Sequence, residues 1–176
     1  MTTSTPCRDL QCPTQAELDW FRNVGVNIMM LASPEPMKIA HGRVAHGVFE
    51  TEPAGDRWCA FEEPDTDDIV FWQPRTRIMS SWTGRAFALG QSIVGRPETY
   101  SFDCNLNIFA DPLDWLRAKR DGIVVLPGNW PLAYERLRDA PRIAIAESLL
   151  PLYRSHMKPP RMPDLFVLSE CWRRAA

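Results

Sequence analysis

The sequence predicts an α+β fold, in which an N-terminal helix and an antiparallel β-meander precede a parallel βαβαβαβ layer. Three observations predict it. A helix-start motif begins at Thr14, and short apolar segments separated by turn residues follow as far as residue 104. From residue 105 to 168, apolar segments alternate with segments of helical pattern. Apolar strands joined by single helices are typical of parallel sheets with right-handed crossovers.

Length and composition indicate one folded unit. The chain has 176 residues, of which 45% are hydrophobic and 24% charged, a balance typical of globular proteins. Lys and Arg total 20 against 22 Asp and Glu, so the formal charge of -2 provides no overall attraction for nucleic acid or acidic membranes. We expect a flexible arm over 1–13 and a single compact domain over 14–176, which comprises a helix-plus-meander half (14–104) and an α/β half (105–176).

The first helix has a defined start and end. Thr14 and Glu17 form a capping box, in which each side chain satisfies the other residue's backbone N–H. Phe21 belongs to an apolar set at helical spacing, and Gly25 can close the helix.

The meander is predicted from short apolar runs between turns, with Gly42 and Gly47 as bends. The expected strands are 26–31, 38–50, 57–62, 68–73 and 77–83. A further edge strand or helical turn is expected at 85–89.

The α/β half is predicted from alternating elements. Asp111 precedes Pro112, a pair typical of the first residues of a helix. The expected strands are 105–110, 123–126, 142–146 and 165–168, and the expected helices are 112–121, 130–138 and 148–157.

Aromatic and basic residues alternate along the predicted meander. Trp72 and Trp82 stand near Arg75, Arg77 and Arg85. Trp and Arg are frequent anchors of protein interfaces, and the same combination can stack bases and hold phosphates. The aromatic residues can equally face the core while the arginines face solvent. We take these five residues as the candidate surface for a protein partner, with nucleic acid as the alternative ligand.

A second candidate site lies at the predicted carboxyl ends of the parallel strands, where open α/β sheets bind ligands. Asp111, Asn129, Glu147 and Glu170 follow these strands. Converging carboxylates bind Mg²⁺ and support phosphoryl chemistry, whereas helix capping alone also explains Asp111. Under this alternative Asp111, Asn129 and Glu147 hold Mg²⁺ or phosphate.

The five cysteines are scattered and odd in number, which favours reduced thiols in a cytoplasmic protein. We expect most of them to be buried. The chain opens without a signal sequence and contains no apolar run long enough for a membrane span. Cys7 and Cys12, together with His41 and His46, provide four possible zinc ligands at spacings looser than those of zinc ribbons.

Four segments carry a resemblance to known sequences: IVFWQPRT, WTGRAFALG, DPLDWLRAKRDGIVVLP and RDAPRIAIAESLLP. With these, residues 68–157 resemble a group of small uncharacterised proteins of alphaproteobacterial prophage and plasmid regions. The resemblance implies a mobile-element setting and no particular activity. A second likeness is to the Toprim fold, because the strand IVVL runs into Pro127-Gly128 before a helix. The catalytic Glu and the Asp-x-Asp of that fold are missing here, so a Toprim relative would be degenerate.

The sequence therefore favours a non-enzymatic accessory protein of a bacterial mobile element that binds a protein partner through Trp72, Arg75, Arg77, Trp82 and Arg85. The alternative is a nucleic-acid-binding or Mg²⁺-dependent phosphoryl-transfer protein with a degenerate Toprim-like site. Whether the chain is an enzyme stays open at this stage, and Mg²⁺ is implied only by the alternative.

Overall fold

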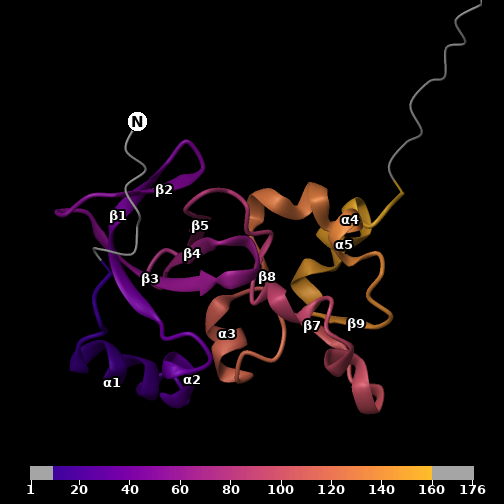
Figure 1. Cartoon of the computed structure of the whole chain (residues 1–176), viewed down its shortest axis with the longest axis horizontal. Helices are drawn as coiled ribbons and strands as arrows, with labels where there is room; N and C mark the ends of the chain where they lie inside the picture. The colour runs from indigo at the N-terminus through magenta and orange to yellow at the C-terminus, as the bar shows by residue number, and fades with distance from the viewer. Residues whose placement is uncertain (1–9, 160–176) are drawn as a thin grey trace, which may run out of the picture.

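The mixed α+β composition is confirmed by a computed structural model, which describes residues 10–159. Figure 1 shows a barrel formed by β1 to β5 at the left, with α1 and α2 below it. The C-terminal half, with α4 and α5, lies to the right of the barrel, and α3 lies between the two parts. None of the helices within residues 10–159 has the length and apolar character that a membrane crossing requires.

Helix α1 spans Gln15–Asn23 and begins as predicted. The Thr14 backbone N–H donates to Glu17 Oε2 at 2.7 Å, and the Glu17 N–H donates to Thr14 Oγ1 at 3.4 Å, which completes the capping box. Phe21 on the inner face is 1% exposed. Gly25 follows the helix with φ of 88°, a left-handed conformation that favours glycine.

The predicted arm over 1–13 lies largely outside the described residues, and its last part is attached to the barrel. Gln11 forms an antiparallel bridge with Ile39 of β1, with N–H···O distances of 2.8 Å in both directions. These two hydrogen bonds hold residue 11 against the sheet edge.

The predicted strand over 26–31 is wrong, because α2 spans Met29–Ala32. The Asn27 side chain accepts the Met29 N–H at 3.0 Å, which favours a turn at this point. Val26 and Leu31 are both buried in the core. A short apolar run has no periodicity that separates a strand from a buried helical turn, so its burial was predictable and its conformation was not.

The predicted meander forms a closed five-stranded barrel instead. The strands are β1 (Lys38–Ala45), β2 (Val48–Thr51), β3 (Asp56–Glu63), β4 (Asp68–Gln73) and β5 (Ile78–Ser81). Their order around the barrel is β1-β2-β5-β4-β3, closed by β1 against β3. Adjacent strands are antiparallel except β2 and β5, which share the single parallel pair Val48 and Ser81. Closure pairs strand edges that an open meander would expose.

The predicted strand over 38–50 is divided by a tight turn. His46 and Gly47 have φ of 53° and 82°, the left-handed pair that a two-residue hairpin requires. Gly42 of β1 lies so close to the Glu50 carbonyl oxygen and the Phe49 ring that a Cβ has no room. The glycines that the sequence marks as bends therefore have different roles, one in a turn and one in a close approach of two strands.

The C-terminal half contains short strands and short helices. Its strands are β6 (Ala88–Leu89), β7 (Leu106–Ile108), β8 (Val124–Val125) and β9 (Ile143–Ile145). Its α-helices are α3 (Pro112–Arg117), α4 (Ala133–Leu137) and α5 (Leu150–His156). Within residues 10–159 the 3-10 segments are Pro64–Thr66, Gln91–Ile93, Pro97–Asp103, Pro127–Leu132 and Glu147–Leu149.

The βαβαβαβ layer is not confirmed by the pairing of these strands. β7 and β9 are parallel, and Ile108 bridges Ile123 in parallel. β8, however, pairs antiparallel with β6, which comes from the segment after the barrel. The elements thus occur near the expected positions, but two two-stranded sheets, linked by the Ile108–Ile123 bridge, replace one layer. The last predicted strand, 165–168, lies outside the described residues.

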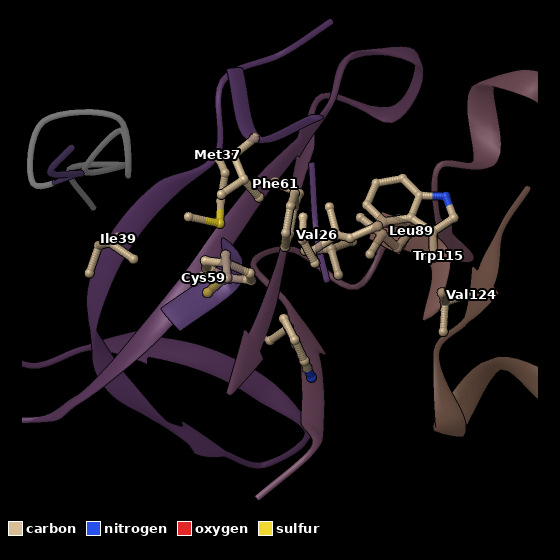
Figure 2. Close-up of a cluster of buried hydrophobic side chains, with 14 of the residues drawn as sticks. Val26, Met37, Ile39, Cys59, Phe61, Leu89, Trp115 and Val124 are labelled. Atoms are coloured by element: carbon tan, nitrogen blue, oxygen red, sulfur yellow. The ribbon is translucent and has the colours of Figure 1, made fainter. Parts of the chain in front are cut away.

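One hydrophobic cluster joins α1, the barrel and the C-terminal half (Figure 2). Phe61 of β3 meets Trp115 of α3 edge to face, with ring centroids 5.7 Å apart. The Arg120 guanidinium lies 5.5 Å from the Phe61 ring and 5.3 Å from the Trp115 ring. Val124 of β8 and Leu89 of β6 complete the contact between the two halves.

The connector between the halves, residues 82–90, is held by the buried carboxylate of Asp68. This carboxylate accepts the N–H groups of Thr83, Arg85 and Ala86 at 2.8–2.9 Å, as well as that of Ile69. Asp68 is only 4% exposed. A buried charge is tolerated when several donors surround it, so this side chain fixes the start of the connector.

Three further polar side chains hold the rest of the connector. Gln91 Oε1 accepts the N–H groups of residues 87 and 88 at 2.7 and 3.3 Å. Asn129 Nδ2 donates to the carbonyls of residues 86 and 87 at 2.8 and 3.2 Å. Glu63 Oε1 accepts the Gly90 N–H at 2.5 Å. Side chains therefore satisfy backbone groups that longer strands would satisfy by pairing.

Candidate functional site

The predicted Trp/Arg surface loses Trp72, which belongs to the core. Trp72 is 1% exposed, and its ring lies 6.4 Å from that of Phe21. Its indole Nε1 is buried and has no hydrogen-bond partner within residues 10–159. Trp72 belongs to the cluster that includes Phe21 of α1, whereas its neighbour Phe71 belongs to the cluster of Phe49 and Trp58, so Trp72 is buried on the α1 side of β4 and cannot contact a binding partner.

The remaining members of that set do not form one surface. Arg77 donates its N–H to the carbonyl of Gln73, the last residue of β4, whereas Arg85 donates to Asp68, the first residue. The six residues of β4 separate these ends by about 17 Å at about 3.3 Å per residue. Trp82 is half-buried against the barrel core. The three arginines are exposed but lie at opposite ends of a strand.

One contact joins the two predicted sites. Arg77 Nε lies 3.6 Å from Asp111 Oδ2, and the Arg77 side chain is 80% exposed. Exposed ion pairs contribute little to stability, between about 0 and 1 kcal/mol. Asp111 also accepts the Leu113 N–H at 2.7 Å and so caps α3, as the sequence predicted.

The three residues of the predicted Mg²⁺ site have separate surroundings. Asp111 caps a helix, Asn129 holds the connector, and Glu147 is exposed at the start of a 3-10 turn. Within residues 10–159 there is no group of three or more His, Cys, Asp or Glu side chains placed to hold a metal ion. Glu170 lies outside that range. The structure therefore does not bring the proposed ligands into one cluster.

The possible zinc ligands are also separated by their contacts. His41 Nδ1 lies 3.4 Å from the Gly55 carbonyl oxygen, and His46 is in the β1–β2 turn. Cys12 is exposed and unpaired within the described chain, and Cys7 lies outside it. Within residues 10–159 the expectation that most thiols are buried is wrong, because Cys12 and Cys104 are exposed and only Cys59 is buried.

A cleft of about 680 Å³ between α1 and the barrel does assemble Trp and Arg side chains. We call it the α1–barrel cleft. Its outer residues include Glu17, Trp20, Arg57 and Arg75, and its inner residues include Phe21 and Cys59. Arg75 is thus the one residue of the predicted surface that lines this cleft.

The side of the cleft formed by β3 carries a fixed ion pair. Arg57 donates from Nε and Nη2 to the two carboxylate oxygens of Glu17, both at 3.0 Å. Burial by itself raises the pKa of Glu17, but hydrogen bonds from Thr14 and Arg57 outweigh this and hold the pKa below its usual value. His41 Nε2 lies 3.5 Å from Arg57 Nη1. Glu17 therefore links the helix cap to the barrel surface.

The remaining lining supplies an apolar contact and one unpaired cation. Trp20 is 40% exposed, and its ring packs edge to face on Phe21 at 4.9 Å. Burial raises the pKa of Cys59, so its thiol stays protonated and acts as an apolar floor. None of the ion pairs in residues 10–159 includes Arg75. The cleft thus combines the exposed Trp20, an apolar floor, the Arg75 cation and the exposed Asp56 carboxylate.

Sequence reasoning missed Trp20 and Arg57 as partners of Arg75. These residues come from α1, β3 and the β4–β5 turn, and only the closed barrel brings them together. One signal was present: Trp20 lies next to Phe21, outside the apolar stripe that points the helix toward the core. A Trp off the core face of an amphipathic helix is a candidate binding residue.

Comparisons with protein-family models, curated proteins and solved structures gave no match.

Proposed function

We propose that this chain is a non-enzymatic accessory protein of a bacterial mobile element, which binds a protein partner in the cytoplasm through the α1–barrel cleft. The proposal keeps the Trp/Arg composition of the predicted surface and changes its members. Trp20, Arg57 and Arg75 replace the group built around Trp72. Its supporting observation is that a half-exposed Trp20, an Arg75 outside every ion pair of residues 10–159 and the buried Phe21 and Cys59 line one cleft.

The chemistry of the cleft defines the kind of segment that fits it. Trp and Arg are over-represented among residues that contribute most to interface affinity. Trp20 offers a flat apolar face, and Arg75 offers hydrogen bonds to a carboxylate. The Glu17–Arg57 pair is already satisfied and sets the shape of the cleft rather than attracting charge. The expected partner segment therefore carries an apolar side chain next to Asp or Glu.

A peptide library displayed on phage and selected on the immobilised full chain tests this proposal. We expect selected peptides to share an apolar residue beside an acidic one. Trp20→Ala and Arg75→Gln should each weaken their binding by about tenfold or more, the loss expected of interface anchor residues. Fluorescence anisotropy with a labelled selected peptide measures the Kd.

Arg77→Gln is the matched control, because it neutralises the exposed arginine two residues along the same turn outside the cleft. It should leave the Kd unchanged. Equal losses for Arg75→Gln and Arg77→Gln would assign binding to general surface charge. Unchanged binding by Trp20→Ala would exclude the cleft, provided that circular dichroism shows the variant to be folded.

A further inference from the structure

A second cleft, of about 330 Å³, lies where the connector meets the C-terminal half, and we propose that it binds a small ligand with a phosphate or carboxylate group on an apolar body. It shares no lining residue with the α1–barrel cleft. Six of its lining residues are Thr66, Arg85, Phe87, Asn129, Leu132 and Arg136. No Asp or Glu lines it. We call it the Arg85–Arg136 cleft.

Arg85 is held in place by its neighbours before any ligand arrives. Its Nη2 donates to the Asp67 carbonyl at 2.6 Å, and its Nε donates to Thr83 Oγ1 at 3.0 Å. Its backbone N–H is bound to Asp68. The Asp67 carboxylate, 3.4 Å from Nη2, is 97% exposed and therefore strongly screened by solvent. A guanidinium fixed in this way keeps hydrogen-bond donors for an oxyanion at little further cost in side-chain entropy.

Arg136 supplies the second positive charge from α4. Its side chain is exposed, and it takes part in none of the ion pairs of residues 10–159. Because Arg85 and Arg136 line the cleft and no Asp or Glu does, the lining favours an anionic ligand, with Asp67 paired to Arg85 from outside the lining. Guanidinium groups bind carboxylate and phosphate oxygens with two parallel hydrogen bonds.

The other side of the cleft is apolar and carries one acceptor. Two apolar side chains line the cleft, Leu132 at 43% exposure and Phe87 at 3%. The Nδ2 of Asn129 donates to two connector carbonyls, which directs its Oδ1 away from them. An apolar wall beside two cations fits a ligand whose charged group is attached to a ring or an alkyl body.

Neighbouring charges favour a small ligand over a nucleic-acid strand. An adjoining depression of about 620 Å³ shares Thr66, Phe87 and Arg136 with this cleft. Its lining adds Asp65, Glu135 and Asp139 against the single further cation Arg96. A phosphate backbone that continued from the Arg85–Arg136 cleft would therefore meet three carboxylates, which repel it.

Isothermal titration with phenyl phosphate, benzoate and inorganic phosphate at constant ionic strength tests the proposal. We expect phenyl phosphate to bind saturably and inorganic phosphate to bind more weakly. The affinity of benzoate is compared with that of phenyl phosphate. A stronger signal from benzoate than from phenyl phosphate identifies a carboxylate ligand, and the reverse identifies a phosphate ligand. Heat effects that match those of equimolar chloride for all three ligands would overturn the proposal.

Arg136→Gln and Arg138→Gln form a matched pair, because both arginines are exposed near the end of α4 and only Arg136 lines the cleft. Arg136→Gln should weaken binding about tenfold or more, as expected for the loss of a charge-assisted hydrogen bond, and Arg138→Gln should leave it unchanged. Equal effects of the two changes would overturn the assignment. Arg136→Glu, which reverses the charge, should abolish binding.

A labelled 10-nucleotide single strand of DNA distinguishes the macromolecular alternative. If the oligonucleotide binds more tightly than phenyl phosphate, and if Arg96→Gln weakens its binding, the cleft binds nucleic acid and the small-ligand proposal is wrong. Trp20→Ala should leave phenyl phosphate binding unchanged, because the two clefts share no lining residue. Failure of either proposal is therefore visible separately from failure of the other.

Discussion

The barrel and the C-terminal half satisfy their backbone groups by different means. β3 pairs with five residues of β1 on one side and five of β4 on the other. β6 and β8 share two residue pairs, and β7 and β9 share three. The connector between the barrel and the C-terminal half, residues 82–90, has its backbone groups bound by the side chains of four residues: Asp68, Gln91, Asn129 and Glu63. The connector therefore depends on a few polar side chains, two of which, Asp68 and Glu63, come from barrel strands.

The same contrast separates the two clefts. The α1–barrel cleft has one wall made of paired strands and one made of a capped helix. The Arg85–Arg136 cleft is built on the connector, so its shape depends on the side chains that hold residues 84–87. A change that loosens the connector should alter the second cleft and leave the first intact.

The largest effect is expected from Asp68→Ala. This change removes the acceptor of the N–H groups of Thr83, Arg85 and Ala86. Each buried donor left unpaired costs about 1–3 kcal/mol, and solvent reaches some of these groups once the connector opens. We expect the free energy of unfolding in urea to fall by about 3 kcal/mol or more. Hydrogen exchange should rise at residues 83–89 before it rises in β3.

Asp65→Ala is the control for this change, because Asp65 is an exposed carboxylate three residues away. Its effect on stability should stay within about 0.5 kcal/mol, as for most surface substitutions. If Asp68→Ala costs no more than Asp65→Ala, or if exchange in β3 and the connector rises together, the proposed difference between the two regions is wrong.

A pH-dependent effect is expected from Glu63, which is 3% exposed at the end of β3. Burial raises its pKa to about 7, although N–H groups of Gly90 and Gln91 partly offset this. The negative charges of Asp65 and Glu35 contribute to this increase, and Arg120 faces the same region. Because the folded state binds this proton more tightly than the unfolded chain does, the stabilisation is complete below about pH 4.5 and disappears as the pH rises through 7.

Glu63→Gln removes this titration and keeps an oxygen for the Gly90 N–H. The interval from 4.5 to about 7 corresponds to about 3 kcal/mol of unfolding free energy. We expect the variant to be more stable than the natural chain at pH 8, by about 1–3 kcal/mol, with a flatter profile between pH 5 and 8 in urea titrations. Glu62→Gln, an exposed neighbour on the same strand, should keep the natural profile. A Glu63→Gln profile as steep as the natural one would contradict the prediction.

The sequence predicted the features that depend on local chemistry. The Thr14–Glu17 capping box and the Asp111 cap are confirmed, because each needs only residues two or three positions apart. Three barrel strands, β3, β4 and β5, lie close to the predicted ranges, since alternation and turn residues define them locally. The turn at His46 and Gly47 was the main local feature that the pattern concealed.

Features that depend on distant pairing could not be predicted in this way. Nothing in the residues of β3 states that it pairs with β1 rather than β2, and that choice closes the barrel. Closure also places Trp20 and Arg75 in the lining of one cleft, while Trp72 is buried against α1. In the C-terminal half, the two residues of β8 are as apolar as a parallel strand, yet they pair antiparallel with β6. The predicted binding surface failed for the same reason, because its members were chosen by their proximity along the chain.

The smallest expected effect is a difference in stability between Phe variants of two buried tryptophans, Trp72 in the barrel and Trp115 in the C-terminal half. Trp115 Nε1 donates to the Gly122 carbonyl at 2.7 Å, whereas Trp72 Nε1 has no partner within the described residues. Both rings lose similar apolar area when changed to Phe, but only Trp72→Phe also removes an unpaired buried donor. We expect Trp115→Phe to cost about 2 kcal/mol more than Trp72→Phe, whose net cost should stay within about 1 kcal/mol. Urea unfolding of the two variants measures the difference, and equal losses would show that the Trp72 N–H is satisfied in solution, where a buried water is the simplest partner.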